Sequence, residues 1–181
     1  LAEQISMGQE EMVYLDTVMD ALSRVSSTKD ISELRDELIS VGYLRGRPTS
    51  RKSVSALPPR HFVSSDGFDI YVGRNNRQND LLTLKTAHGR DIWLHTKNIP
   101  GSHTIIETRN RDVPDRTLEE AAVLAAYHSK AFDSAQVPVD YTLVKHVHKP
   151  NGAKPGKVIY DSQQTIYVKP EKAVCDKLMV E

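Results

Sequence analysis

The sequence contains a single cysteine, Cys175, among its 181 residues. One thiol cannot form a disulfide within the chain, and such sparse cysteine is typical of a reducing compartment. No apolar run approaches the roughly 18 residues that a membrane-spanning helix needs, so we expect no membrane partner. The amino terminus lacks a basic start followed by an apolar block, so we expect no secretory signal in this sequence. Because the chain opens at Leu1 rather than Met, we expect a piece of a longer protein.

Common catalytic and cofactor motifs are also missing. The sequence has no GxxxxGK[ST] loop, no GxSxG elbow, no HExxH and no CxxC, so no triphosphate loop, serine hydrolase or zinc site is predicted. Asp91, His95, Ser102 and His103 would suit acyl transfer, but neighbours on a strand point to opposite faces, which separates Ser102 from His103. A metal would need His146 and His148 together with another histidine. We expect neither catalysis nor a cofactor.

The formal net charge is zero, but the charges are unevenly distributed. Residues 1–40 carry nine acidic and three basic side chains, a net charge of −6. The remaining residues carry 15 acidic and 21 basic side chains, a net charge of +6. A basic C-terminal part favours a polyanionic partner such as nucleic acid.

Residues 1–43 are predicted to form the end of a coiled-coil arm followed by a short helix. Residues 1–26 lack proline, and their apolar side chains recur at alternating steps of three and four residues, which is the coiled-coil period. The members of this seam are Ile5, Met12, Leu15, Met19 and Leu22. Packing on the adjoining domain is the alternative, and dimerisation of the fragment through the seam is a second one.

The short second helix has its own boundary signals. Asp30 as N-cap with Glu33 three residues later predicts a capping box, and Gly42 predicts the end of the helix. Residues 44–59 then contain basic residues, prolines and serines without any acid or period. We interpret them as a basic linker.

Residues 60–172 are predicted to form an α+β domain with a mixed, mainly antiparallel sheet and two packed helices. Asp66-Gly67 between two β-type runs predicts a hairpin. Strands are expected at 91–96 and 103–108, joined at Pro100-Gly101, and three more between 141 and 169. Helices are expected at 75–87 and from a capping box at Thr117 to about Phe132. Residues 173–181 are left as a C-terminal tail.

Two clusters and a loop suit RNA. The segment 73–80 combines arginine forks with asparagine amides at a strand-to-helix junction, where phosphate oxygens can be bound. On the strand at 91–96, Trp93 shares a face with His95 and could stack an unpaired base beside Lys97. Around two glycine turns, Lys145, Lys149 and Lys154 form a basic loop suited to a phosphate backbone. The alternatives are a capped helix with solvated arginines, a buried Trp93, and a merely solvated loop.

The strings FDIYVGRNNRQND and DIWLHTKNIPGSH resemble the C-terminal RNA-binding module of the NFACT family of ribosome quality-control factors. The resemblance covers about residues 60–170, and the arm, short helix and linker are similar to the family's layout. It implies a cytoplasmic, ribosome-associated factor that binds obstructed large ribosomal subunits through rRNA. It also implies that the whole factor recruits tRNA for C-terminal alanine tailing, with the tailing residues in an N-terminal domain outside this sequence.

The resemblance also assigns site residues and an alternative partner. Matching positions expected at the RNA are Arg74, Asn75, Asn76, Arg77, Asn79, Trp93, His95, Lys97, Ser102 and His103. We expect their basic and amide side chains to converge on one accessible surface. Because bacterial members have been called fibronectin-binding proteins, fibronectin is the alternative partner, with an adhesin module as the alternative function.

Overall fold

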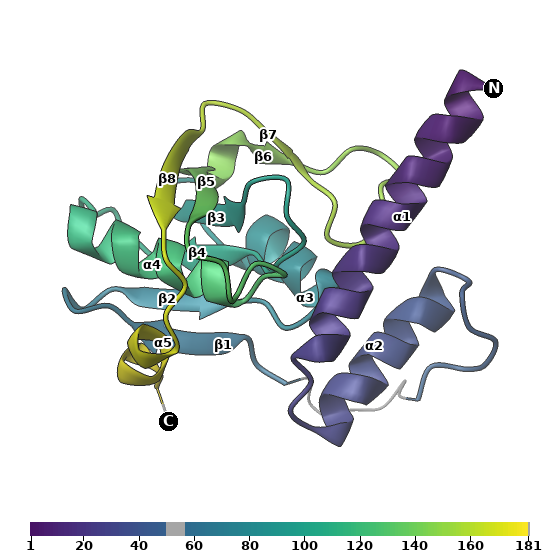
Figure 1. Ribbon diagram of the computed structural model, residues 1–181, viewed down its shortest axis with the longest axis horizontal. Helices are drawn as coiled ribbons and strands as arrows, with labels where there is room; N and C mark the ends of the chain where they lie inside the picture. Colours follow the sequence, from purple (N-terminus) through teal and green to yellow (C-terminus); the bar gives the residue numbers. More distant parts are fainter. Residues whose placement is uncertain (50–56, 181) are drawn as a thin grey trace.

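The structure is a computed structural model that describes residues 1–49 and 57–180 (Figure 1). Its centre is a sheet of six strands in the order β1-β2-β4-β3-β5-β8, in which every neighbouring pair is antiparallel. The strands are β1 (Arg60–Val63), β2 (Asp69–Val72), β3 (Ile92–Thr96), β4 (Thr104–Ile106), β5 (Val137–Leu143) and β8 (Gln164–Val168). The predicted α+β class with a mainly antiparallel sheet is confirmed.

Helices α4 (Asp115–Tyr127) and α5 (Lys172–Leu178) cover one face of this sheet (Figure 1). The main core lies between them and the sheet, and small alanines on α4 let the helix approach the strands closely. The predicted helix start at Thr117 is wrong. Helix α4 begins two residues earlier, and the Thr117 hydroxyl donates to Asp66 Oδ2 at 2.9 Å rather than capping the helix. The expected tail contains α5, which places Cys175 in the core.

The opposite face of the sheet is covered by short elements. These are α3 (Asn76–Leu81), the π-helical turn η1 (Leu82–Thr86), the 3-10 turn η2 (Val144–His146) and the two-stranded ribbon of β6 (Val147–His148) and β7 (Ile159–Tyr160). They bury a second apolar cluster that contains Leu82, Trp93 and Ile105. The predicted helix at 75–87 is confirmed, although Leu81 faces solvent and Leu82 takes the buried position.

Local turn chemistry explains the hairpins. The turn Ser65-Asp66-Gly67 joins β1 to β2, and Gly67 has a φ of +79°, which suits glycine because it has no Cβ. The register pairs His61 with Tyr71 and Phe62 with Ile70. Strands β3 and β4 also pair, as the turn at 100–101 predicted.

Two helices, which together we call the arm, precede the domain and pack beside it. Helix α1 (Ala2–Ser23) runs past α3 and extends beyond the domain, and α2 (Thr28–Ser40) lies along its lower half (Figure 1). The predicted N-cap at Asp30 is wrong, because Ser27 caps α2 and accepts from the Asp30 N–H at 3.2 Å. The predicted end is confirmed, since Gly42 has a φ of +87° just after the helix.

The apolar seam of α1 stays exposed. Its members expose between 37% and 69% of their surface, whereas the buried row is Tyr14, Val18 and Ala21, on the neighbouring helix face. Burial of that row means that α1 packs on the domain, as the alternative interpretation held. The coiled coil and the dimer stay predictions. Within the described ranges, no helix has the length and apolar character required to traverse a membrane.

Candidate nucleic-acid interface

The segment 73–80 forms a capped helix start. Asn75 precedes α3 in extended conformation, and its Oδ1 accepts from the Gln78 N–H at 2.8 Å. Arg74 N donates to Gln78 Oε1 at 2.7 Å, so two side chains close the turn reciprocally. The interpretation that an asparagine caps this helix is therefore confirmed.

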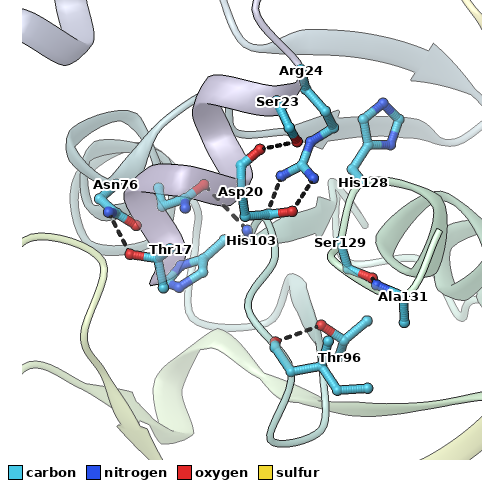
Figure 2. Close-up of polar contacts among 12 residues, drawn as sticks. Thr17, Asp20, Ser23, Arg24, Asn76, Thr96, His103, His128, Ser129 and Ala131 are labelled. Carbon is cyan, nitrogen blue, oxygen red and sulfur yellow. Dashed lines mark hydrogen bonds and ion pairs between the residues drawn. The ribbon is translucent and has the colours of Figure 1, made fainter. Parts of the chain in front are cut away.

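The asparagine amides of this segment reach the arm rather than open solvent. Asn76 Nδ2 donates to Thr17 Oγ1 at 2.8 Å (Figure 2) and to Glu37 Oε1 at 3.2 Å. Asn75 Nδ2 donates to Glu33 Oε2 at 3.0 Å. Both amides are thus occupied by side chains of α1 and α2, and they join the arm to the domain.

The two arginines of the segment differ. Arg74 Nε donates to the Pro58 carbonyl at 2.7 Å, and its Nη1 lies 3.7 Å from Asp30 Oδ1. Burial raises the pKa of Asp30, but hydrogen bonds from Ser26 and Ser27, together with the Arg74 charge, outweigh burial and lower it. Arg74 therefore faces a carboxylate that stays charged. Arg77 is exposed.

His103 and Asn79 hold the fold beneath the segment. His103 donates its backbone N–H to Asn79 Oδ1 at 3.2 Å, and its ring nitrogens lie 2.8 Å from Thr83 Oγ1 and 3.2 Å from the Gly156 carbonyl. A carbonyl only accepts, so Nε2 carries the proton and Nδ1 accepts from Thr83. Burial and the neighbouring His95 lower the pKa of His103 to about 3. His103 is neutral and structural.

Trp93 is in the core. Its surface is 1% exposed, and its ring packs 4.6 Å from Tyr160 and 5.4 Å from His103 between ring centroids. The interpretation of an exposed indole that stacks a base is wrong, because η2 and the β6–β7 ribbon cover this face. His95 stacks on Trp93 and is partly buried. Ser102 is also buried.

The lysine loop is tied to its surroundings. Lys149 Nζ lies 2.9 Å from Asp80 Oδ2 and donates to the Lys154 carbonyl at 2.7 Å. Lys154 Nζ donates to the Tyr43 hydroxyl at 2.7 Å and lies over the rings of Tyr14 and Tyr43. Lys149 therefore ties the loop to α3, Lys154 ties it to the arm, and Lys145 lies apart, exposed.

The expected single surface does not form. Arg74, Asn75, Asn76, Asn79, Lys149 and Lys154 are paired within the molecule, and Trp93, Ser102 and His103 are buried. The open cations among the predicted residues are Arg77, Lys97 and Lys145. The physical reason is that carboxylates of the chain itself, most of them on the acidic arm, take the place that RNA phosphates would take.

A groove that we call the His88 groove was missed by the sequence analysis. Its volume is about 340 Å³, and it lies between the turn at 88–91, the turn at 107–110 and Lys145. The side chains of His88, Arg90 and Lys145 are exposed, and no carboxylate in the described ranges forms an ion pair with Arg90 or Lys145. The short sequence HGRD gave only a weak turn signal.

Asp91, considered for catalysis, and His146, considered as a metal ligand, each contact other residues of the chain. Asp91 accepts from the N–H groups of His88 at 2.8 Å and Thr108 at 2.9 Å. His146 Nδ1 lies 3.3 Å from Asp161 Oδ1. In the part of the chain that the structure describes, no three His, Cys, Asp or Glu side chains come together as a metal site.

Gly73 tests the packing beneath the segment. We expect Gly73→Ala to lower the free energy of unfolding by about 1–3 kcal/mol, because overpacking forces neighbours to shift. A Cβ there would lie 1.9 Å from Asn79 Oδ1, which is held by His103, and 3.3 Å from the Asn79 Cα. Urea unfolding measures the loss. The matched control is Gly8→Ala on exposed α1, where nothing lies within 4 Å and a small gain is expected; equal effects at both glycines would contradict the prediction.

Comparison of the sequence with known proteins shows to which family the chain is similar. Residues 59–162 match the family model of the NFACT protein RNA binding domain. The Rqc2 homolog RqcH of Bacillus subtilis is 49% identical over 181 residues, covering 97% of this chain and 31% of the relative. Ribosome quality control complex subunit 2 of Schizosaccharomyces pombe is 36% identical over 78 residues, covering 42% of this chain and 8% of that protein.

A solved structure shares the whole arrangement. The C-terminal part of the fibronectin/fibrinogen-binding protein from Streptococcus suis superposes with a TM-score of 0.91 at 40% identity, covering 99% of this chain and 71% of that one. The arm packed on the domain is therefore common to both. The chain spans about a third of the RqcH relative's length. Since the family model covers five of the six strands of the sheet, the 73–80 segment and the lysine loop, the chain belongs to the NFACT RNA-binding-domain family.

Proposed function

We propose that this chain is the RNA-contacting part of a cytoplasmic, ribosome-associated quality-control factor, and that it catalyses no reaction itself. The whole factor would bind tRNA and the rRNA of obstructed large ribosomal subunits and promote alanine tailing of stalled chains. The observation that carries the proposal is the match of residues 59–162 to an RNA-binding family. Relatives named for ribosome quality control support the setting.

The His88 groove is the surface that we propose for the RNA backbone. Arg90 and Lys145 are exposed and free of carboxylate partners among the described residues, so phosphates meet no internal competitor there. Two acids line the groove, and both are engaged within the chain: Glu107 lies 3.1 Å from Arg109, and Asp91 accepts from the N–H groups of His88 and Thr108. Contacts of this kind bind phosphate without reading sequence.

We expect Arg90→Glu combined with Lys145→Glu to weaken tRNA binding at least tenfold. The plot of log affinity against log salt has a negative slope, and two lost phosphate contacts would reduce the magnitude of that slope by about two. Fluorescence anisotropy with labelled tRNA over a salt series measures both values. The matched control reverses Arg116 and Lys172, which lie on α4 and α5 and are each paired with an acid on their own helix. Equal losses in both double variants would show a general charge effect and overturn the assignment.

Fibronectin is the second candidate partner, because the solved neighbour is described as a fibronectin/fibrinogen-binding protein. The same salt series separates the two candidates. Binding of fibronectin that exceeds tRNA binding at low salt and survives reversal of Arg90 and Lys145 would favour the adhesin function. Absence of tRNA binding at low salt would overturn the RNA proposal.

A further inference from the structure

A second cavity, which we call the Arg60 pocket, lies where β1 begins at the edge of the sheet. Its volume is about 620 Å³, within the range of about 300–1,000 Å³ typical of small-molecule sites. The side chains that define it are Pro58, Arg60, His61, Tyr71, Arg74 and Met179. Among the described residues, no acidic side chain lines it. The pocket is therefore cationic and partly apolar.

Arg60 is an unsatisfied cation beside this cavity. Its Nη2 donates to the Arg24 carbonyl at 3.2 Å, while its Nη1 is buried and has no partner in the described part of the chain. Burial, followed by repulsion from Arg74 and Arg24, lowers the pKa of Arg60 to about 10, although the charge of Asp30 opposes this shift. A buried guanidinium with no carboxylate in direct contact is costly, so an anion in the adjoining space would compensate it.

The acids nearest to the neighbouring arginines do not compensate the Arg60 charge, because each of them is already paired. Arg24 forms a two-point ion pair with Asp20, shown in Figure 2, and Arg74 lies 3.7 Å from Asp30. Each of these arginines thus has its own acid on the arm. Of the three arginines, Arg60 alone forms no ion pair among the described residues, and it lies next to the cavity.

Two stacked rings line the same cavity. His61 and Tyr71 face each other across β1 and β2, with ring centroids 4.8 Å apart and planes 11° apart. His61 is fixed by Asp69, whose Oδ1 lies 2.7 Å from Nε2. Flat rings next to a cationic group are the combination with which proteins bind unpaired nucleotides, by stacking the base and neutralising the phosphate.

We propose that the Arg60 pocket binds one nucleotide of a single-stranded RNA segment, with the phosphate near Arg60 and the base against the Tyr71 and His61 rings. The proposal rests on the proposed RNA-binding function and adds a second contact, separate from the His88 groove. An acidic peptide would satisfy Arg60 equally well, but it gives the stacked rings no partner, so the observations favour RNA.

The experiment titrates the protein against a hexanucleotide of adenine that carries 2-aminopurine, following anisotropy and base fluorescence. We expect Arg60→Gln and Tyr71→Leu each to weaken binding about tenfold, and Tyr71→Leu also to abolish the fluorescence quenching that stacking causes. Arg116→Gln, an exposed arginine on α4, is the control and should bind as wild type. Because Arg60→Gln removes an uncompensated buried charge, its unfolding midpoint without RNA should not fall.

The outcomes separate this pocket from the function on which it rests. Wild-type affinity in both pocket variants, with loss in the Arg90 and Lys145 variant, would overturn the pocket and leave RNA binding intact. Absence of binding by the wild-type protein would overturn the proposed function itself. Displacement of the hexanucleotide by a hexaglutamate peptide at equal concentration would show an acidic-peptide site and overturn the nucleotide assignment. If Arg60→Gln does not fold, Tyr71→Leu decides the test.

Discussion

Replacing Trp93 by alanine is expected to lower the free energy of unfolding by about 3–5 kcal/mol, the usual loss for a large aromatic removed from a core. The ring is 1% exposed and sits between β3 and the segments that cover the second face of the sheet. Its neighbours include Tyr160 and His103, so its removal leaves a cavity that the short elements around it cannot close. Urea unfolding followed by circular dichroism measures the loss.

The matched control is Trp93→Phe, which keeps a ring at the site. We expect a smaller loss of about 1–2 kcal/mol, because less volume is removed. RNA binding by the folded phenylalanine variant should equal that of the wild type. An alanine variant as stable as the wild type but unable to bind RNA would contradict the buried position and restore the stacking interpretation.

Local sequence signals predicted much of the domain, because local chemistry determines them. The Asp66-Gly67 turn, the alternation in 91–96 and the glycine after α2 each act within a few residues. The helix over 75–87 was also predicted from the sequence. These elements are confirmed with boundaries shifted by one or two residues.

The sequence did not predict which segments cover each face of the sheet, because those segments are distant in the chain. Alternation correctly placed Trp93 opposite Leu94, but both faces of the strand are covered. The cover over Trp93 comes from Val144, Val147 and the β6–β7 ribbon, about 50 residues later in the chain. Nothing in the local pattern of 91–96 signals that cover.

The arm is the main reason why the asparagine and lysine clusters do not form the predicted RNA surface. An arginine or amide prefers an anion, and a sequence does not distinguish an RNA phosphate from a carboxylate of the same chain. The opposite net charges of residues 1–40 and the remainder favour a polyanionic partner. In the structure part of that charge is used internally, as in the contacts of Lys154 and Lys157 with acids of α1. Two sites remain for a ligand: a pocket beside Arg60 that no acidic side chain lines among the described residues, and the His88 groove, whose two acids are engaged within the chain.

Glu37 is the centre of the contact between arm and domain. It is completely buried, and its Oε1 accepts from the Tyr14 hydroxyl at 2.8 Å and from Asn76 Nδ2 at 3.2 Å, while Oε2 has no partner in the described ranges. Burial raises the pKa of Glu37 above its ordinary value of 4.5, although the hydrogen bonds from Tyr14 and Asn76 and the charge of Arg77 oppose that rise. The folded protein therefore binds this proton more tightly than the unfolded chain does.

The linkage between proton binding and folding gives the sign of the pH dependence of stability. The stability that the raised pKa of Glu37 contributes is fully present below the ordinary glutamate value of 4.5 and is lost as the pH rises through the folded-state pKa. Glu37→Gln keeps an acceptor for Tyr14 and Asn76 but carries no charge. We expect it to remove this part of the pH dependence and to raise the free energy of unfolding at pH 8 by about 1 kcal/mol.

Glu37→Ala is expected to act in the opposite direction. It leaves the buried Tyr14 hydroxyl without its acceptor and opens a cavity, which together cost about 2–4 kcal/mol. Urea unfolding of both variants between pH 4 and 8, with Glu3→Gln on exposed α1 as the control, measures the two effects. A glutamine variant that parallels the wild type at every pH would mean that Glu37 is not the titrating group, and that the arm is held by its uncharged contacts alone.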